Sequence, residues 1–262
     1  EFDRDIHVCR PHGIPAHWRR YVTLDYGMDM LAALWVAVDE QGRAVVYREL
    51  YEGRDNGKGE NGQGHIISAA ARRLLEVNGG DEVQAWLAPP DLWNRRQDTG
   101  KSAAELFLEN GVPLTKTGNS RVAGWLAVRE FLAPGPGGQA RGGEATQTLR
   151  LRTSGPASCS ETEAEAPQAS GPALPRLRIF DTCANLIRTL PALRHDERKP
   201  EDAAVTPHEL THAPDALRGF CTYWSTAAHA PEAAVHDILR DDFNMKKPTA
   251  GPLGQGGKYR VI

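Results

Sequence analysis

Three apolar runs separated by two short turns lie between residues 20 and 51, and they constrain the fold of the chain most. Residues 21–27 read YVTLDYG, residues 31–38 read LAALWVAV and residues 44–50 read AVVYREL. Runs of this length, rich in β-branched and aromatic residues and bounded by glycine and acidic residues, are typical of β-strands. Because short turns join neighbouring strands in antiparallel order, the sequence predicts a three-stranded meander.

The first of these strands carries an acid close to its end. Alternate residues of a strand point to opposite faces, so Val22 and Leu24 share one face. Tyr21, Thr23 and Asp25 then share the other. A carboxylate in a sheet is costly unless it is solvated, paired or bound to a metal ion. Asp25 is therefore either a cap for the following turn or a candidate site residue.

Composition excludes several classes of protein. The 262 residues are 40% apolar, which is enough for one large domain or two small ones. The net charge of −3 excludes a uniformly basic nucleic-acid binder, so contact with nucleic acid requires a local patch. The four cysteines contain no CxxC pair and are typical of reduced thiols: Cys9, Cys159, Cys183 and Cys221.

No targeting or membrane segment is recognisable. No run approaches the roughly 20 apolar residues of a membrane-spanning helix. The opening residues 1–4 lack the apolar region of a signal peptide, and this abrupt start predicts a fragment of a longer protein. We therefore expect a cytoplasmic protein with no membrane partner.

Polarity and low complexity suggest the domain organisation. Residues 1–19 are polar and contain prolines, so they are expected to be a lead-in or linker. The main domain is expected at 20–228, with a low-complexity insert rich in Gly, Pro, Ser and Glu at about 133–175. Within that insert only residues 148–151 resemble a strand. Residues 229–262 form a Gly- and Pro-rich tail.

Helices and further strands follow the meander. After a glycine-rich loop, residues 65–76 place apolar side chains on one helical face, and residues 83–88 are typical of a strand. Strand, helix and strand in this order predict a crossover and a parallel pair. Asp91 then follows the carboxyl end of a strand, where open α/β sheets place their sites. The other expected elements are helices at 101–110, 120–132, 183–190 and 207–228 and a strand at 177–180.

A third acid, Asp215, follows Pro214, a residue that suits the first turn of the last helix. Taken singly, an aspartate at such a position usually caps a helix or interacts favourably with the positive end of the helix dipole. Taken together, Asp25, Asp91 and Asp215 predict carboxylates gathered at one edge of the sheet. Such hard oxygen ligands suit Mg²⁺ or Mn²⁺. Two such ions can activate water and stabilise the leaving oxygen in phosphodiester hydrolysis.

Three motifs resemble those of the nuclease domain of tailed-bacteriophage terminase large subunits: LDYG at 24–27, APPDLW at 88–93 and THAPDALRGF at 211–220. The connecting segments are similar too: YRELYE at 47–52, GNSRVAGWLAVREFL at 118–132 and LRIFDTCANLIRTLPAL at 177–193. The order and spacing of these segments over about 20–228, the insert apart, carry the resemblance. It implies an α/β, RNase H-like fold, with a mixed central sheet of antiparallel meander plus parallel strands flanked by helices.

The resemblance also implies a function. It predicts a metal-dependent endonuclease that cuts concatemeric double-stranded viral DNA during packaging. Carried over residue by residue, Asp25, Asp91 and Asp215 would be the catalytic acids that hold two Mg²⁺ or Mn²⁺ ions. The implied partners are double-stranded DNA, a packaging ATPase domain, a small terminase subunit and a portal, in the cytoplasm of a host cell. The candidate auxiliary residues are Asp29, Glu49 and His212.

Two features depart from the family pattern. Thr211 stands where family members often carry an aspartate before the histidine, so one acid is missing. The packaging ATPase is absent as well, since no GxxxxGK[ST] motif occurs. Residues 98–102 read DTGKS, but Arg95 replaces the first glycine and no apolar strand leads in. We expect a helix N-terminus there.

Residues 208–212 read HELTH and match the HExxH signature of zinc proteases. That mechanism needs both histidines on one face of a continuous helix, with Glu209 as general base. Glu232 has a spacing that suits a third ligand, but Pro214 would interrupt the helix. A zinc protease remains the weaker alternative. The other alternative is a DNA-binding or docking module without its own cutting activity.

The DNA-facing surface is the least defined feature. Trp93, next to Asp91, either stacks on a base or is a half-buried core residue, and the second interpretation is favoured. Arginines are candidates for phosphate contacts, although each one alone is more simply solvated surface. The candidates are Arg95, Arg96, Arg176 and Arg178, with Arg72, Arg73, Arg194, Arg198 and Lys199 as further basic residues.

Overall fold

The computed structural model describes residues 2–27, 29–53, 65–95, 97, 100–133 and 175–227. The chain divides into two units, residues 1–224 and 225–262. The first unit is built on a seven-stranded sheet in the order β1-β7-β4-β3-β2-β5-β6. The expected insert, apart from its first and last residues, lies outside the described residues, as do its strand at 148–151 and the expected tail.

The antiparallel meander forms as predicted. Its strands are β2 (Arg19–Tyr26), β3 (Met30–Val38) and β4 (Ala44–Gly53), paired in sequence order. All nine residues of β3 are buried because a strand lies on each side and helices cover both faces. The turn between β3 and β4 is held by Asp39, whose carboxylate accepts two backbone N–H bonds. Gly42 closes it with φ of 75°, a left-handed conformation that glycine adopts without strain.

Parallel strands extend the meander on both sides. β5 (Ala85–Ala88) lies parallel to β2, and β6 (Leu114–Lys116) lies parallel to β5. On the other side, β7 (Leu177–Phe180) lies parallel to β4, and β1 (Val8–Cys9) lies parallel to β7. This confirms the predicted mixed sheet, in which parallel strands flank an antiparallel meander. Neither β1, which forms within the expected lead-in, nor β6 was predicted from the sequence.

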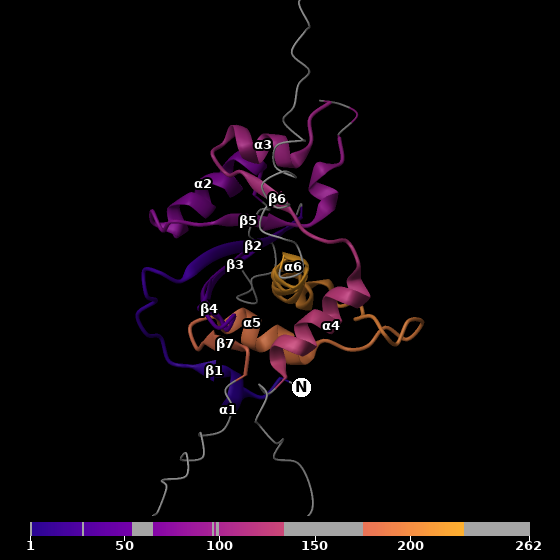
Figure 1. Cartoon of the computed structure of the whole chain (residues 1–262). Helices are drawn as coiled ribbons and strands as arrows, with labels where there is room; N and C mark the ends of the chain where they lie inside the picture. Colours follow the sequence, from indigo (N-terminus) through magenta and orange to yellow (C-terminus); the bar gives the residue numbers. More distant parts are fainter. Residues whose placement is uncertain are drawn as a thin grey trace, which may run out of the picture. The chain divides into compact units, whose positions relative to one another are not determined.

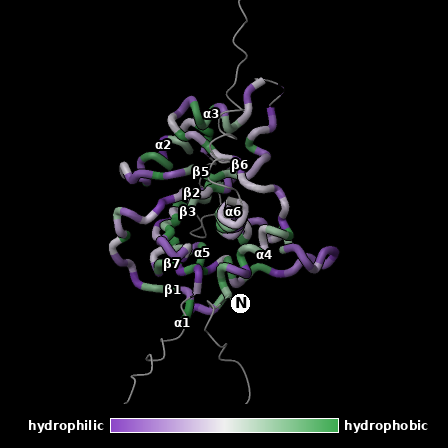
Figure 2. Tube along the Cα trace, in the orientation of Figure 1, coloured by the Kyte–Doolittle hydropathy of each residue, from purple (hydrophilic) through white to green (hydrophobic). Residues whose placement is uncertain are grey.

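Helices cover both faces of the sheet (Figure 1). The helices α2 (Ile67–Asn78) and α3 (Ala103–Glu109) pack on one face. The helices α4 (Arg121–Leu132), α5 (Ala184–Thr189) and α6 (His212–Ala227) pack on the other. Figure 2 shows hydrophobic residues along the central strands and hydrophilic residues in connecting loops.

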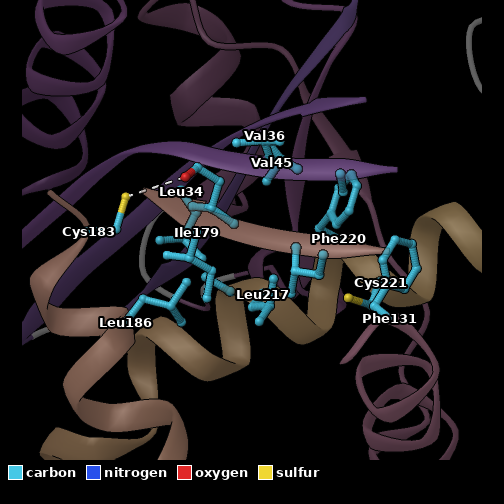
Figure 3. Close-up of a cluster of buried hydrophobic side chains, with 14 of the residues drawn as sticks. Leu34, Val36, Val45, Phe131, Ile179, Cys183, Leu186, Leu217, Phe220 and Cys221 are labelled. Atoms are coloured by element: carbon cyan, nitrogen blue, oxygen red, sulfur yellow. Dashed lines mark hydrogen bonds between the residues drawn. The ribbon is translucent and has the colours of Figure 1, made fainter. Parts of the chain in front are cut away.

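The predicted alternation along β2 separates these two cores. Val22 and Leu24 belong to the cluster under α2 and α3. Tyr21 packs in the cluster under α6, where the hydroxyl of Thr23 donates a 2.7 Å hydrogen bond to a backbone carbonyl of that helix. Side chains from β3, β7 and α6 meet in this second cluster, which Figure 3 shows around Leu34, Val36, Ile179, Leu217 and Phe220.

The short elements complete the unit. They are α1 (Arg4–His7) and the 3₁₀ turns η1 (Pro90–Trp93), η2 (Leu190–Ala192) and η3 (His208–Leu210). The P-loop-like segment ends at Ser102, which caps α3 in a capping box with Glu105, so the expected helix N-terminus is confirmed. Within the described ranges, every helix is too short or too polar to span a membrane.

Candidate active site

The carboxyl ends of three adjacent parallel strands, β2, β5 and β6, open on one cavity of about 270 Å³. Asp25 lies near the end of β2, and Asp91 lies in the turn that follows β5. Asp215 lies in the first turn of α6. All three side chains belong to residues that line this cavity, so the structure brings the three sequence-predicted acids together.

Local sequence explains the place of Asp91. Pro89 holds an extended conformation, with φ of −67° and ψ of 150°, that ends β5. Pro90 then opens the 3₁₀ turn η1, a position where its missing N–H and fixed φ cost nothing. Leu92 is buried and anchors the turn, so exposed Asp91 is presented at the rim of the cavity.

Close packing of α6 sets the place of Asp215. A Cβ atom at Gly219 would lie 3.2 Å from the Thr23 hydroxyl on β2. A Cβ atom at Gly124 on α4 would lie 2.7 Å from Cγ of Arg218. A side chain at Gly124 would force a neighbour to move, and one at Gly219 would make an unusually tight contact. The first turn of α6 is thereby held over the end of β2.

Asp25 is the most perturbed acid of the site. Burial raises the pKa of its carboxyl, although 26% of the side chain remains exposed. The hydrogen bond and charge of His212 act to lower that pKa, and the charges of Asp215 and Asp91 act to raise it. The raised pKa means that the surroundings of Asp25 compensate its negative charge incompletely.

Asp215 is instead compensated by two arginines. Nε of Arg218 donates to its Oδ1 at 2.8 Å, and Nη1 of Arg121 donates to the same oxygen at 3.3 Å. Arg121 also pairs with Asp202 at 3.1 Å. Both arginines line the cavity. Sequence reasoning missed them, and the three-residue spacing of Asp215 and Arg218 on one helix was the only local signal.

The donor set fits the ions that the resemblance implies. Three carboxylates on one cavity offer the hard oxygen ligands that Mg²⁺ and Mn²⁺ prefer. A divalent cation beside Asp25 would favour its charged form, which burial disfavours. To bind such a cation, Asp215 would have to give up hydrogen bonds that it accepts from Arg218 and Arg121. Asp25, Asp91 and Asp215 are therefore the candidate ligands, although their carboxylate oxygens do not all lie within 4.8 Å of one another.

No protein-family model matches the sequence, and no curated protein matches it significantly. Solved structures do match. The large terminase of a thermophilic bacteriophage, in complex with ATP-γ-S, is 15% identical, with a TM-score of 0.56, over 85% of this chain and 44% of that one. The ADP complex of the same terminase is 15% identical with a TM-score of 0.56, over 84% and 42%. The nuclease domain of the bacteriophage SPP1 large terminase with bound Mn is 12% identical with a TM-score of 0.44, over 84% and 97%.

The matches to the thermophilic-phage structures extend over 84–85% of this chain. The chain has a terminase nuclease-like fold. It spans less than half the length of the thermophilic-phage large terminase that it matches.

The candidate auxiliary residues His212, Asp29 and Glu49 lie in three different places relative to the cavity. His212 contacts the site directly, with its Nδ1 2.8 Å from Oδ2 of Asp25. Asp29 is not among the residues that line the cavity and lies 3.6 Å from Nδ1 of His208.

The side chain of Glu49 lies at the start of α5. Its carboxylate accepts hydrogen bonds from the backbone N–H groups of Asn185 at 2.9 Å and Leu186 at 2.8 Å. These N–H groups lie at the start of α5, where the N-cap residue Cys183 does not cap the helix with its side chain; its thiol donates instead to the carbonyl of Val46 at 3.7 Å. Glu49 is thus a helix cap supplied by a neighbouring strand, and it lies outside the lining of the cavity.

The predicted arginine contacts lie away from the cavity. Arg95 is 75% exposed and pairs with Glu105 at 3.5 Å. Arg176 stacks on Phe131 at 4.7 Å, and Arg178 lies on β7 with a buried Nε that has no hydrogen-bond partner among the residues described. Arg96 lies outside the described residues. Trp93 is a partly buried core residue, as favoured from the sequence.

The HExxH segment does not form the helix that a zinc protease needs. His208 lies in the 3₁₀ turn η3, which ends at Leu210, and α6 begins only at His212. Pro214 is accommodated within the first turn of α6, where no intrahelical N–H bond is lost. The two histidines therefore do not share a face of one continuous helix, and the geometric basis of the protease alternative is absent.

Proposed function

We propose that this chain is the nuclease domain of a viral DNA-packaging large terminase and hydrolyses phosphodiester bonds of concatemeric double-stranded DNA. The observation that carries the proposal is the convergence of Asp25, Asp91 and Asp215, from three separate elements, on one cavity. The terminase nuclease-like fold supports it. The position is also the usual one, because α/β sheets place their sites at the carboxyl ends of parallel strands.

Each residue has a role in this reaction. Bound Mg²⁺ or Mn²⁺, as a pair, would lower the pKa of a water molecule and stabilise the leaving oxygen. The three acids would bind the two ions. His212 orients the carboxylate of Asp25 through its 2.8 Å contact. Arg121 and Arg218 give the cavity a positive component that attracts the phosphate backbone.

The wider setting follows from the same proposal. A nuclease domain of this kind works on double-stranded DNA beside a packaging ATPase domain, with a small terminase subunit and a portal as partners, in the cytoplasm of the host cell. Two of the similar large-terminase structures are complexes with ADP or ATP-γ-S, which supports the ATPase part.

Cleavage of supercoiled plasmid tests the proposal. The wild-type chain should nick and linearise plasmid with Mn²⁺ or Mg²⁺ and should be inactive in EDTA. Asp91→Asn keeps the shape of an exposed side chain and should abolish cutting. Glu209→Gln is the matched control, because Glu209 is an exposed acid outside the cavity. Cutting that survives Asp91→Asn would overturn the assignment.

One observation favours the second candidate, a DNA-binding or docking module. Asp215 is already neutralised by Arg218 and Arg121, as in a purely structural ion-pair network. Such a module would shift duplex DNA in a gel without cutting it under any metal. It would also bind DNA equally well with and without Asp91→Asn, whereas cutting that depends on Asp91 would exclude it.

A further inference from the structure

Three side chains with metal-binding atoms meet beside the acid cavity. They are Asp29 between β2 and β3, His208 in η3 and His212 at the start of α6. One ligand atom of each lies within 4.8 Å of one ligand atom of both others. In the described part of the chain this is the only group of at least three such residues that comes so close. The rings of the two histidines lie edge to face, with centroids 4.4 Å apart.

The hydrogen bonding of His212 leaves one ring nitrogen for a ligand. Its Nδ1 is engaged by the Asp25 carboxylate, while the whole residue is only 3% exposed. Among the described residues, its Nε2 has no hydrogen-bond partner. Metal-binding histidines usually donate their second ring N–H to a carboxylate in this way, which fixes the tautomer and ring orientation. His212 is thus already arranged as a ligand.

The other two side chains provide access from solvent. The side chains of His208 and Asp29 are 61% and 48% exposed, and Nδ1 of His208 lies 3.6 Å from Oδ2 of Asp29. Ligands about 2.0–2.2 Å from a tetrahedral zinc ion lie roughly 3.3–3.6 Å from one another. That pair is therefore close to its ligated spacing. Both of these exposed side chains have a ligand atom within 4.8 Å of one of His212, so binding of a shared cation requires them to move closer to it.

We propose that Asp29, His208 and His212 bind one transition-metal cation of the Zn²⁺ class at a site separate from the acid cavity. Two imidazoles and one carboxylate suit zinc and its neighbours, whereas the oxygen-only acids suit Mg²⁺ and Mn²⁺. A water molecule takes the fourth position. The site uses both histidines of the HExxH segment without a continuous helix, so it carries no proteolytic mechanism.

The cation joins two parts of the unit that carry the candidate active site. Asp29 lies in the connection that follows β2, the strand of Asp25, and His212 begins the helix that carries Asp215. An ion held there fixes His212, and His212 contacts Asp25. The consequence for cutting rests on the proposed nuclease function. The binding of the cation does not.

Cobalt binding tests the site directly, because Co²⁺ replaces Zn²⁺ and its visible ligand-field absorption reports the ligands. The full chain is titrated with Co²⁺ in excess Mg²⁺, which occupies the oxygen ligands of the acid cavity, and Zn²⁺ is then added in competition. The wild type should bind one Co²⁺ ion per chain, and Zn²⁺ should displace it. His208→Ala and Asp29→Asn should each weaken binding by about tenfold or more.

Two controls separate this site from its neighbours. Glu209→Ala changes the acid between the histidines and should leave the cobalt spectrum unchanged. Asp91→Asn changes the acid cavity and should also leave it unchanged. Wild-type affinity in His208→Ala, loss of the signal in Asp91→Asn, or no Co²⁺ binding by the wild type would each overturn the inference. Because absorption is measured without DNA, an inactive nuclease does not affect the result.

Discussion

Nδ1 of His212 lies 2.8 Å from Oδ2 of Asp25, and this contact joins the first turn of α6 to the end of β2. The two residues are 187 positions apart in the chain. The contact only partly offsets the cost of placing a carboxylate there, since burial keeps the pKa of Asp25 above its ordinary value. The metal-free protein is therefore destabilised at a position that a divalent cation would stabilise.

Asp25→Asn should raise the melting temperature of the protein in EDTA at about pH 7.5 and abolish its increase on addition of Mn²⁺. A carboxyl with a raised folded-state pKa stabilises the fold below its unfolded pKa, and that contribution is lost as pH rises through the folded value. Since asparagine does not ionise, the gain should shrink towards about pH 4. Thermal unfolding at both pH values measures it.

A second aspartate provides the control for this substitution. Asp196 is a partly exposed residue whose carboxyl pKa is lowered by hydrogen bonds from the backbone N–H groups of Arg198 and Lys199. Asp196→Asn should therefore give no gain in melting temperature at neutral pH and should leave the Mn²⁺ response intact. An Mn²⁺ response that persists in Asp25→Asn would show that the metal site is misassigned.

Arg218→Gln should tighten Mn²⁺ binding while it destabilises the metal-free protein. Nε of Arg218 donates to Asp215 at 2.8 Å, and its side chain is 11% exposed. Loss of a charged hydrogen bond in such a position lowers the free energy of unfolding by about 1–3 kcal/mol. Asp215 then has one fewer cation in competition with the metal. Calorimetric titration with Mn²⁺ checks this, and an affinity equal to or below wild type would contradict it.

Gly124→Ala should destabilise the fold, although alanine is the better helix former by about 0.5–1 kcal/mol. The new Cβ would lie 2.7 Å from Cγ of Arg218 and 2.8 Å from Oγ1 of Thr222, so α4 or α6 must move. Overpacking of this kind costs about 1–3 kcal/mol. Urea unfolding measures the change. Gly13→Ala, where nothing lies within 4 Å of the new atom, should be nearly neutral.

Glu49→Ala should lower stability without affecting metal-dependent cutting. The substitution removes the acceptor for the Asn185 and Leu186 N–H groups at the start of α5, and loss of a helix cap costs about 0.5–2 kcal/mol. Urea unfolding and plasmid cleavage at a temperature where the variant is folded separate the two effects. Loss of cutting in fully folded protein would return Glu49 to the active site.

Local pattern was sufficient to predict much of the sheet. Apolar alternation predicted β2 with Val22 and Leu24 on one face, and the apolar run at 83–88 predicted the strand whose carboxyl end Asp91 follows. These features depend on residues close together in sequence. The mixed sheet itself was predicted mainly from the resemblance, because a parallel pair leaves no local mark of which strand lies beside which.

Long-range contacts explain what the sequence did not predict. β1 has two residues, too few for a periodic signal, and forms only because β7 lies beside it. Arg121 reaches Asp215 across 94 positions, and Glu49 caps a helix 136 positions away. Nothing near Arg121 or Glu49 in the sequence indicates these partners, since tertiary packing alone brings them together.

Anomalous scattering from crystals grown with Mn²⁺ tests the central claim most directly. The account predicts manganese peaks in the cavity bounded by Asp25, Asp91 and Asp215, with Asp215 withdrawn from at least one arginine. The same crystals of Asp91→Asn should lose or weaken those peaks. A cavity without manganese in the wild type, at concentrations that support plasmid cleavage, would contradict the account.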